Sequence, residues 1–402
     1  MNFLFLHQNM PGQFGHLAAA LAREPGNRVV FLTRRHDREL GGVERLTYPA
    51  PRPVHSRTHH YLHQFEDGVL HGQATARVGL ALAQQGFVPD LIVVHPGWGE
   101  GLFLKDVWPD APILNYGEFY YRPNGADVNF CPETQIDIDA IFKLRSRNAH
   151  LLLALEAATH TICATTWQKS LHPRVFHDRI SVIHDGIDTD QMRPEPGSRF
   201  TLPDGRGLTR DDEVVTFVSR TLEPYRGFHT LMRALPQLCA RRPSAQIVIV
   251  GGDGPGYGAA PRDGRSWRQT LLDEVPLDAS RVHFTGVLDR GDYRRLLQVA
   301  AAHVYLTVPF VLSWSMLEAM AAGCLVIGSR TPPVEEVLVD RRNGLLVDFF
   351  SPDELAETVA FALDRRDELK PLCQAARETV LRDYSIDVCL PRQRALIASL
   401  AG

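Results

Sequence analysis

Short runs of β-branched and aromatic residues alternate along the chain with longer segments in which apolar residues recur at helical spacing. The short runs predict strands, the longer segments predict helices, and their alternation is typical of a parallel sheet with crossover helices. In the first half the predicted strands are Asn2–Leu6, Arg28–Leu32, Asp90–His95, Ile113–Tyr116, His160–Ala164 and Ile180–Ile183. The predicted helices there include Gln13–Arg23 and a long one over about Asp137–Ala157.

The alternation breaks at 191–212, which is rich in proline and glycine and lacks apolar periodicity. This composition predicts a linker with a surface loop. The later strands are predicted at Val214–Ser219, Gln246–Val250, Val282–Thr285, His303–Leu306 and Leu325–Gly328. The later helices are predicted at Gly227–Arg241, Asp289–Ala300, Trp314–Ala322, Pro352–Leu363, Glu368–Arg382 and Val388–Leu400. We therefore predict an α/β fold with two facing Rossmann-like domains, 1–190 and 213–384, and a ligand in the cleft between them.

Composition narrows the class of protein. The 402 residues exceed what one hydrophobic core usually serves, and a formal net charge of −4 argues against a nucleic-acid-binding protein. None of the six cysteines forms a CxxC pair, so we expect a reducing, cytoplasmic setting. The N-terminal apolar run is too short for a signal peptide, and no transmembrane helix is expected. Peripheral contact with the inner face of a membrane stays open, because an interfacial helix needs only one apolar face.

Two arginines provide the most informative candidate chemistry. Arg220 and Arg226 follow the predicted strand Val214–Ser219, and Gly227 opens the next helix. Guanidinium groups offer paired donors that suit phosphate oxygens. Their position beyond the carboxyl end of a strand predicts a diphosphate clamp. The alternative is a pair of solvated loop arginines.

Two further candidates lie in the first half. Gly12 precedes a helix whose free N–H groups favour an anion. His95 ends a strand, where it could hydrogen-bond a substrate or exchange a proton. A tight turn would explain Gly12 equally well, and a core or capping histidine would explain His95.

Glu318 lies on an apolar helix, where a carboxylate needs a partner such as a ribose diol or a structural arginine.

The sequence gives only weak indications of a metal site. Short Asp-x-Asp matches are frequent by chance, and a polar loop entering a helix explains the histidines near position 60. We predict no metal ion. These matches and histidines are Asp137-Ile138-Asp139, Asp188-Thr189-Asp190, His55, His59, His60 and His63.

Taken together, these motifs resemble the family 4 retaining glycosyltransferases of the two-domain GT-B fold, over nearly the whole chain. The resemblance rests on Ser219-Arg220…Arg226-Gly227, His184-Asp185-Gly186-Ile187-Asp188, Val250-Gly251-Gly252-Asp253-Gly254 and Leu317-Glu318-Ala319-Met320-Ala321-Ala322-Gly323. It implies that residues 385–402 rejoin the N-terminal domain through a helix that crosses back. It also implies that Arg220 and Arg226 hold the donor diphosphate, that Glu318 binds ribose, and that His95 lies near the reacting sugar. The donor site would further include Gly12, Gly252, Phe310 and Ser313.

Two positions depart from the family pattern. Arg226 replaces a lysine, and Phe310 stands where the family has a glutamate that faces the donor sugar, eight positions before Glu318. A phenyl ring cannot accept a hydroxyl hydrogen bond. We therefore expect an altered donor preference, or recognition by Ser313, Ser315 and main-chain amides while Phe310 packs beneath the loop.

The resemblance implies an enzyme that transfers a sugar from a nucleoside diphosphate sugar, with UDP expected as the nucleotide, to a glycan, lipid-linked saccharide or small-molecule hydroxyl. No cofactor or metal is expected, and the acceptor and oligomeric state are unspecified. Two alternatives stay open, a GT-B epimerase or phosphorylase and a non-catalytic nucleotide-sugar-binding protein. Turnover of a nucleotide sugar would separate enzyme from binder.

Overall fold

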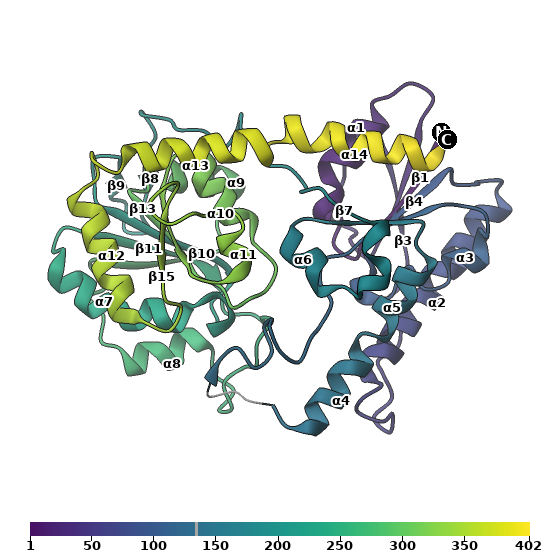
Figure 1. Cartoon of the computed structure of the whole chain (residues 1–402), viewed down its shortest axis with the longest axis horizontal. Coiled ribbons are helices and arrows are strands. Elements are labelled where there is room, and N and C mark those ends of the chain that lie inside the picture. The colour runs from purple at the N-terminus through teal and green to yellow at the C-terminus, as the bar shows by residue number, and fades with distance from the viewer. Residues whose placement is uncertain (133–135) are drawn as a thin grey trace. The chain divides into compact units, whose positions relative to one another are not determined.

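The computed structural model describes residues 1–132 and 136–402, which divide into two compact units (Figure 1). Unit 1 comprises Met1–Gly186 and Ile386–Gly402, and unit 2 comprises Ile187–Ser385. The two segments at these boundaries pair with each other, because the Ile187 N–H donates to the Tyr384 carbonyl at 2.7 Å. The Rossmann-like character of both halves is confirmed.

The predicted linker 191–212 belongs to unit 2. Phe200–Thr201 (β8) and Gly207–Leu208 (β9) form an antiparallel hairpin. Phe200, Leu202 and Leu208 are buried in one cluster with residues of the main sheet and its helices. These apolar positions are too few and too irregular to show periodicity, although their burial fixes the segment to the unit.

Unit 1 contains a seven-stranded parallel sheet in the order β3-β2-β1-β4-β5-β6-β7. Its strands are Asn2–Leu6, Arg28–Thr33, Val43–Thr47, Leu91–Val94, Ile113–Tyr116, His160–Cys163 and Ile180–Val182 (β1–β7). Alternate residues of β1 enter different cores: Phe3 and Phe5 join one cluster, Leu4 and Leu6 another. Both faces of the sheet are therefore covered, as expected of a parallel sheet.

The helices of unit 1 are α1 (Gly15–Ala22), α2 (His63–Gln84), α3 (Leu104–Val107), α4 (Ile138–Arg147), α5 (Ala149–Ala157), α6 (Thr166–Leu171) and α14 (Ile386–Ala401), with 3-10 turns η1 (Gly12–Phe14), η2 (Pro96–Trp98) and η4 (Arg174–Arg179). The single helix predicted over about 137–157 is divided into α4 and α5 at Asn148. The Asn148 side chain is bonded to both backbone groups of Tyr121.

Unit 2 contains a six-stranded parallel sheet in the order β12-β11-β10-β13-β14-β15. Its strands are β10 (Val214–Thr221), β11 (Gln246–Gly252), β12 (Val282–Gly286), β13 (Ala302–Tyr305), β14 (Leu325–Ser329) and β15 (Leu345–Val347). Its helical elements are η5 (Pro224–Arg226), α7 (Phe228–Arg241), α8 (Trp267–Glu274), α9 (Arg290–Val299), α10 (Trp314–Ala321), α11 (Pro332–Glu335), α12 (Pro352–Asp364) and α13 (Lys370–Asp383).

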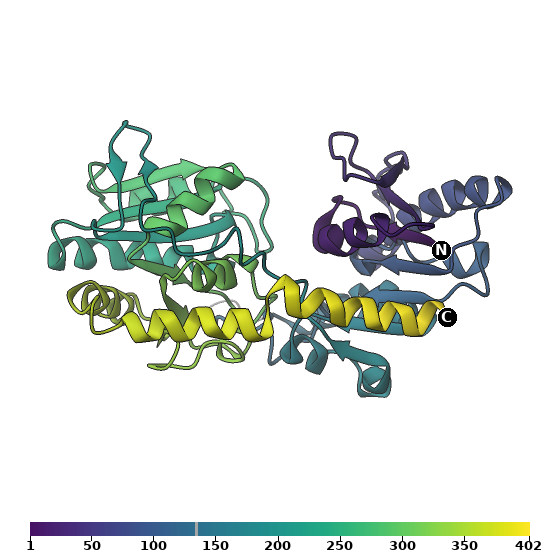
Figure 2. The same ribbon diagram turned by 90° about the horizontal axis from the view of Figure 1, so that it is seen from above.

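The last two helices, drawn in yellow in Figures 1 and 2, belong to different units. Helix α13 packs against α10, whereas α14 packs against α1. Leu390, Leu396 and Leu400 of α14 are partly buried against the core that contains Phe3 and Phe5. The predicted return of the chain to the N-terminal domain is therefore confirmed. In the part of the chain that the structure describes, no helix is long and apolar enough to cross a membrane.

Candidate functional site

The two predicted arginines of unit 2 line one pocket of about 90 Å³, together with Ser313. The ladder between β10 and β11 shifts register between Val218 and Thr221, and Arg220 lies within this irregularity, exposed. A bulge of this kind re-aims side chains at a strand end. Sequence spacing and the strand irregularity thus bring both guanidinium groups to the carboxyl edge of the sheet.

Arg226 is held by neutral acceptors. Its Nη1 donates to Thr307 Oγ1 at 2.9 Å, to the Val311 carbonyl at 2.9 Å and to the Tyr305 hydroxyl at 3.3 Å. Across residues 1–132 and 136–402, no carboxylate oxygen lies within 4.0 Å of either Arg220 or Arg226. Both positive charges therefore remain available to an anion.

Gly227 allows the turn from this pocket into α7. Its φ is +68°, and a Cβ atom there would lie 2.3 Å from Leu306 Cβ. Only glycine suits both the left-handed conformation and the close approach. Gly252 ends β11 beside the same pocket, where its carbonyl accepts from Leu222 N–H at 2.9 Å.

Sequence reasoning missed Tyr257, an aromatic residue that lines the arginine pocket. The guanidinium carbons of Arg220 and Arg226 lie 4.8 and 5.6 Å from its ring centroid. The sequence indicates this residue only weakly, because a single tyrosine in a glycine-rich loop has no characteristic spacing from other residues.

Glu318 already has protein partners. Its Oε1 lies 2.6 Å from Arg290 Nη2, and its Oε2 accepts from the Tyr293 hydroxyl at 2.6 Å. The structural-arginine alternative therefore describes its state here. The Arg290 side chain is 55% exposed, whereas that of Glu318 is 7% exposed. Ser313, at the other end of α10, caps that helix by accepting from Ser315 N–H at 3.3 Å.

In unit 1, His95 belongs to a chain of polar side chains. His7 Nε2 lies 2.8 Å from Gln13 Oε1, Gln13 Nε2 donates to Glu118 Oε1 at 2.8 Å, and Glu118 Oε2 lies 3.3 Å from His95 Nε2. Gly97 N–H donates to His95 Nδ1 at 3.2 Å. Nδ1 of His95 is therefore an acceptor, and its Nε2 faces the Glu118 carboxylate.

His7 explains the need for glycine at position 12. Gly12 has φ +52°, and a Cβ atom there would lie 2.4 Å from His7 Nε2. Burial, and then the nearby His95, lower the pKa of His7 to about 3, so its ring is neutral near pH 7. The structure therefore gives Gly12 a packing role beside the polar chain, and donor binding by Gly12 stays a prediction.

His95 lines a second small pocket of about 60 Å³ in unit 1, with Glu118, Arg147 and His150. The Arg147 guanidinium carbon lies 3.7 Å from the Tyr121 ring centroid, and His150 Nε2 lies 3.1 Å from the Gly97 carbonyl. This arrangement offers a carboxylate, a cation and histidines to a polar ligand.

The weak metal signals have local roles. Asp137 caps α4 by accepting from Ala140 N–H at 2.8 Å, and Asp188 accepts from Gln191 N–H at 3.0 Å. His60 lies 3.2 Å from Asp139, in the loop that enters α2. Within the described residues, no group of three or more His, Cys, Asp or Glu side chains is placed to hold a metal ion.

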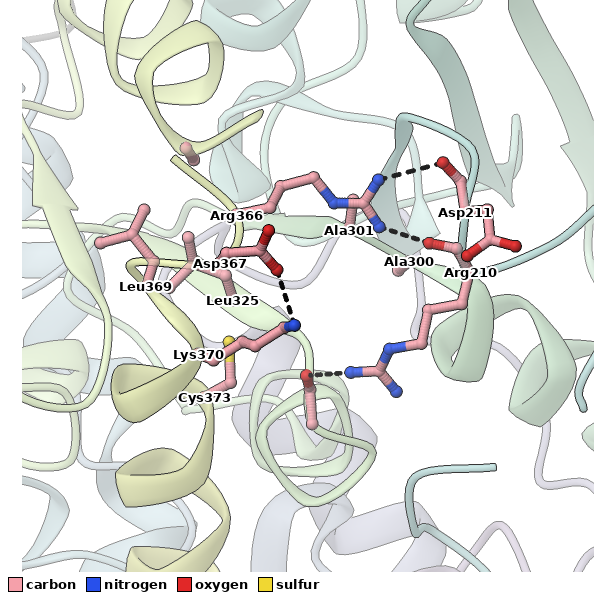
Figure 3. A pocket seen from close by; sticks show the side chains of 12 residues that line it. Arg210, Asp211, Ala300, Ala301, Leu325, Arg366, Asp367, Leu369, Lys370 and Cys373 are labelled. Carbon is pink, nitrogen blue, oxygen red and sulfur yellow. Dashed lines mark hydrogen bonds and ion pairs between the residues drawn. The ribbon is translucent and has the colours of Figure 1, made fainter. Parts of the chain in front are cut away.

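A larger pocket of unit 2, about 370 Å³, lies at the opposite edge of the sheet, where β14 begins. Figure 3 shows its cations engaged by the protein. Arg366 donates to the carbonyls of Arg210 and Asp211, and Lys370 lies 2.6 Å from Asp367. This pocket contains none of the predicted donor-site residues.

Comparison with known proteins agrees with this geometry. Residues 25–192 match the model described as "Glycosyl transferase family 4 group", and residues 200–379 match "Glycosyl transferases group 1". This chain belongs to the family 4 glycosyltransferases. The resemblance predicted from its motifs is confirmed.

Three known proteins show how far this similarity extends. It is 27% identical over 241 residues to D-inositol 3-phosphate glycosyltransferase 2 of Catenulispora acidiphila, covering 57% of this chain and 53% of the relative. It is 32% identical over 218 residues to a GDP-mannose-dependent alpha-(1-6)-phosphatidylinositol monomannoside mannosyltransferase of Mycobacterium tuberculosis, covering 52% and 53%. The matches thus span about half the length of these curated relatives. Sucrose-phosphate synthase of Thermosynechococcus elongatus shares the fold, with a TM-score of 0.72, 18% identity and coverage of 100% and 99%.

Phe310, the residue that departs from the family pattern, is 4% exposed and does not line the arginine pocket. Its ring centroid lies 4.8 Å from that of Tyr257 and 5.4 Å from that of Tyr225. The Arg226 guanidinium carbon lies 5.7 Å from the Phe310 ring. In this chain the residue at the position of the family's glutamate therefore belongs to an aromatic cluster beside the arginines.

Proposed function

We propose that unit 2 binds a nucleoside diphosphate sugar and that the protein transfers the sugar, with retention, to a hydroxyl acceptor. The observation that carries this proposal is the pair Arg220 and Arg226, which share one pocket at a carboxyl sheet edge and lack carboxylate partners within 4.0 Å among the described residues. Ligands of open α/β sheets bind at this edge. The family membership supports the reaction class.

The leaving diphosphate gains negative charge as the glycosidic bond breaks. Cations fixed in advance stabilise that charge without reorganising during the reaction. Arg226 is fixed by its three acceptors. Arg220 and Arg226 would take the part that a metal ion plays elsewhere, so we propose transfer without a metal or an organic cofactor.

The donor nucleotide is proposed to be UDP, as the family resemblance implies, with GDP as the second candidate because one relative is GDP-mannose-dependent. Glu318 would accept from the ribose hydroxyls by competing with Tyr293 and Arg290. Gly252, Ser313 and the aromatic cluster beneath the arginines would complete the donor site.

Unit 1 is proposed to serve the acceptor. His95 and Glu118 form a polar pair in its small pocket.

Peripheral membrane contact is supported by α4, which exposes Ile138 and Phe142 together with Lys143 and Arg145. Apolar side chains beside basic ones suit the surface of an anionic membrane. Sedimentation with anionic vesicles but not with neutral ones would support this part.

The deciding experiment measures thermal unfolding with UDP and GDP, followed by turnover of UDP-sugars and GDP-mannose. At a ligand concentration 100 times Kd, the fold should gain about 2.7 kcal/mol. Turnover or slow hydrolysis that persists in excess EDTA would support a metal-independent enzyme. Binding without any turnover would favour the non-catalytic alternative, whereas an unchanged melting temperature with both nucleotides would reject the donor site.

A further inference from the structure

The loop after β11 is anchored over the arginine pocket by one buried carboxylate. Glu223 is 2% exposed, and its two oxygens accept from Tyr257 N–H at 3.0 Å and from Gly258 N–H at 2.8 Å. A Cβ atom at Gly256 would lie 2.2 Å from Glu223 Oε2, so glycine permits this approach. Thr221 adds a second anchor by donating to the Pro255 carbonyl at 3.2 Å.

The anchored loop places the Tyr257 ring against both guanidinium groups, 4.8 Å from Arg220 and 5.6 Å from Arg226. An aromatic face attracts a cation without neutralising it. It also restricts a flexible side chain before a ligand arrives, which lowers the ordering cost of binding. The ring also contacts Phe310 and Tyr225, whose centroids lie 4.8 and 6.1 Å away.

Glu223 itself lines the pocket that contains Arg220 and Arg226. It nevertheless lies outside ion-pair distance of both, since no carboxylate of the described chain lies within 4.0 Å of either arginine. Its oxygens are occupied by the loop amides. Release of the loop would free this carboxylate to pair with an arginine and compete with a bound phosphate.

We propose that Glu223 and Tyr257 are positioning residues for the diphosphate. Glu223 fixes the loop and is itself kept away from the arginines, while Tyr257 holds both guanidinium groups ready and still charged. This role rests on the proposed donor site in unit 2. Neither residue takes part in bond making or breaking, so their loss should weaken donor binding far more than it slows the chemical step.

The first test compares Tyr257→Leu, which removes the ring, with Tyr257→Phe, which keeps it. Affinities for UDP and GDP are measured beside those for uridine and guanosine. Tyr257→Leu should lower the affinity for the nucleoside diphosphates about three- to thirtyfold, in line with the strength of cation–π contacts. Nucleoside affinity and kcat should stay within about twofold of wild type, and Tyr257→Phe should behave as wild type. Equal diphosphate affinity in all three proteins overturns the role of the ring.

The second test examines the anchor without any ligand. Glu223→Gln should speed hydrogen exchange at the Tyr257 and Gly258 amides at least tenfold and should raise the donor KM. Arg268→Gln, which breaks the ion pair between Arg268 of α8 and Asp253 at the start of this loop, serves as the matched control and should leave donor KM unchanged. Unaltered exchange in Glu223→Gln overturns the anchor. Wild-type protein that binds neither UDP nor GDP overturns the donor site itself, an outcome distinct from a failed exchange test.

Discussion

The charged side chains at the carboxyl edges of the two sheets have different kinds of partners. At the unit 1 edge, His7, Gln13 and Glu118 are joined by hydrogen bonds, and His95 lies against the carboxylate. At the unit 2 edge, Arg220 and Arg226 lie against an aromatic ring and neutral oxygens. At one edge the carboxylate and the histidines contact one another, whereas at the other edge two positive charges have no carboxylate within ion-pair distance among the described residues.

This difference indicates which of the two edges is better suited to bind an anion. A chain of polar side chains that contact one another is held in place by these contacts, and it can orient a proton without a ligand. Cations held by neutral partners keep most of their attraction for phosphate, because no carboxylate must be displaced. The proposed division of labour, with the donor in unit 2 and acceptor chemistry in unit 1, follows from this contrast.

The largest effect is expected from Arg226→Ala. Loss of this guanidinium removes charge-assisted bonds worth about 1.5–3 kcal/mol to the diphosphate, so kcat/KM should fall about 100-fold. Steady-state kinetics with the preferred donor would measure the loss. Arg210→Ala, at the opposite edge of the same sheet, is the control and should leave kcat/KM unchanged. Similar losses in both variants would mean that general destabilisation, and not the clamp, is responsible.

Acid should destabilise the protein next most strongly. Burial lowers the pKa of His7 in unit 1, and of His303 in unit 2, to about 3. In the unfolded chain these histidines take up protons near pH 6.5, whereas in the folded chain they stay neutral down to about pH 3. The free energy of unfolding is therefore highest above pH 6.5 and decreases as the pH falls toward 3. Each histidine should lower the free energy of unfolding by roughly 2–3 kcal/mol at pH 4.5. Urea unfolding at pH 7 and 4.5 measures this difference, and His303→Gln should reduce the dependence of the unfolding free energy on pH. An identical pH dependence in the variant would contradict the assignment.

Glu118→Gln should separate the two edges functionally. The amide keeps an acceptor for Gln13 but removes the negative charge that faces His95. We expect kcat to fall about tenfold, a modest loss for an acid–base group, with donor Kd unchanged. Calorimetry with the nucleotide, beside steady-state kinetics, would show this. A matching loss of donor affinity would argue against separate roles.

The smallest effect is expected from Phe310→Leu. The side chain is buried among Tyr225 and Tyr257, and a leucine conserves much of its apolar volume. If Phe310 supports the aromatic cluster, kcat/KM should change less than about threefold for parent-sugar and deoxy-sugar donors alike. A selective change for one deoxy sugar would instead show that this position reads the donor, and Phe310→Glu would then be the informative second variant.

Much of the fold could be predicted from sequence because parallel strands are buried on both faces and read as short apolar runs. The edge strands β3 and β15 were missed: β3 is only partly buried, and β15 has three residues. The segment 191–212 was predicted as a linker, but the few apolar residues of its hairpin join the core of unit 2. Isolated apolar positions become informative only when their packing partners are known.

The sequence by itself determined the two βα-repeating halves and the family, and it singled out Arg220 and Arg226, because strand ends, glycines and charges follow one another locally. The tertiary structure decided what surrounds those charges. Tyr257 lies 31 positions beyond Arg226, and Glu318 meets Arg290 from another helix. Such partners are separated in the chain and joined only by folding. Spacing can therefore locate a charge, but whether that charge is neutralised or kept available depends on long-range contacts.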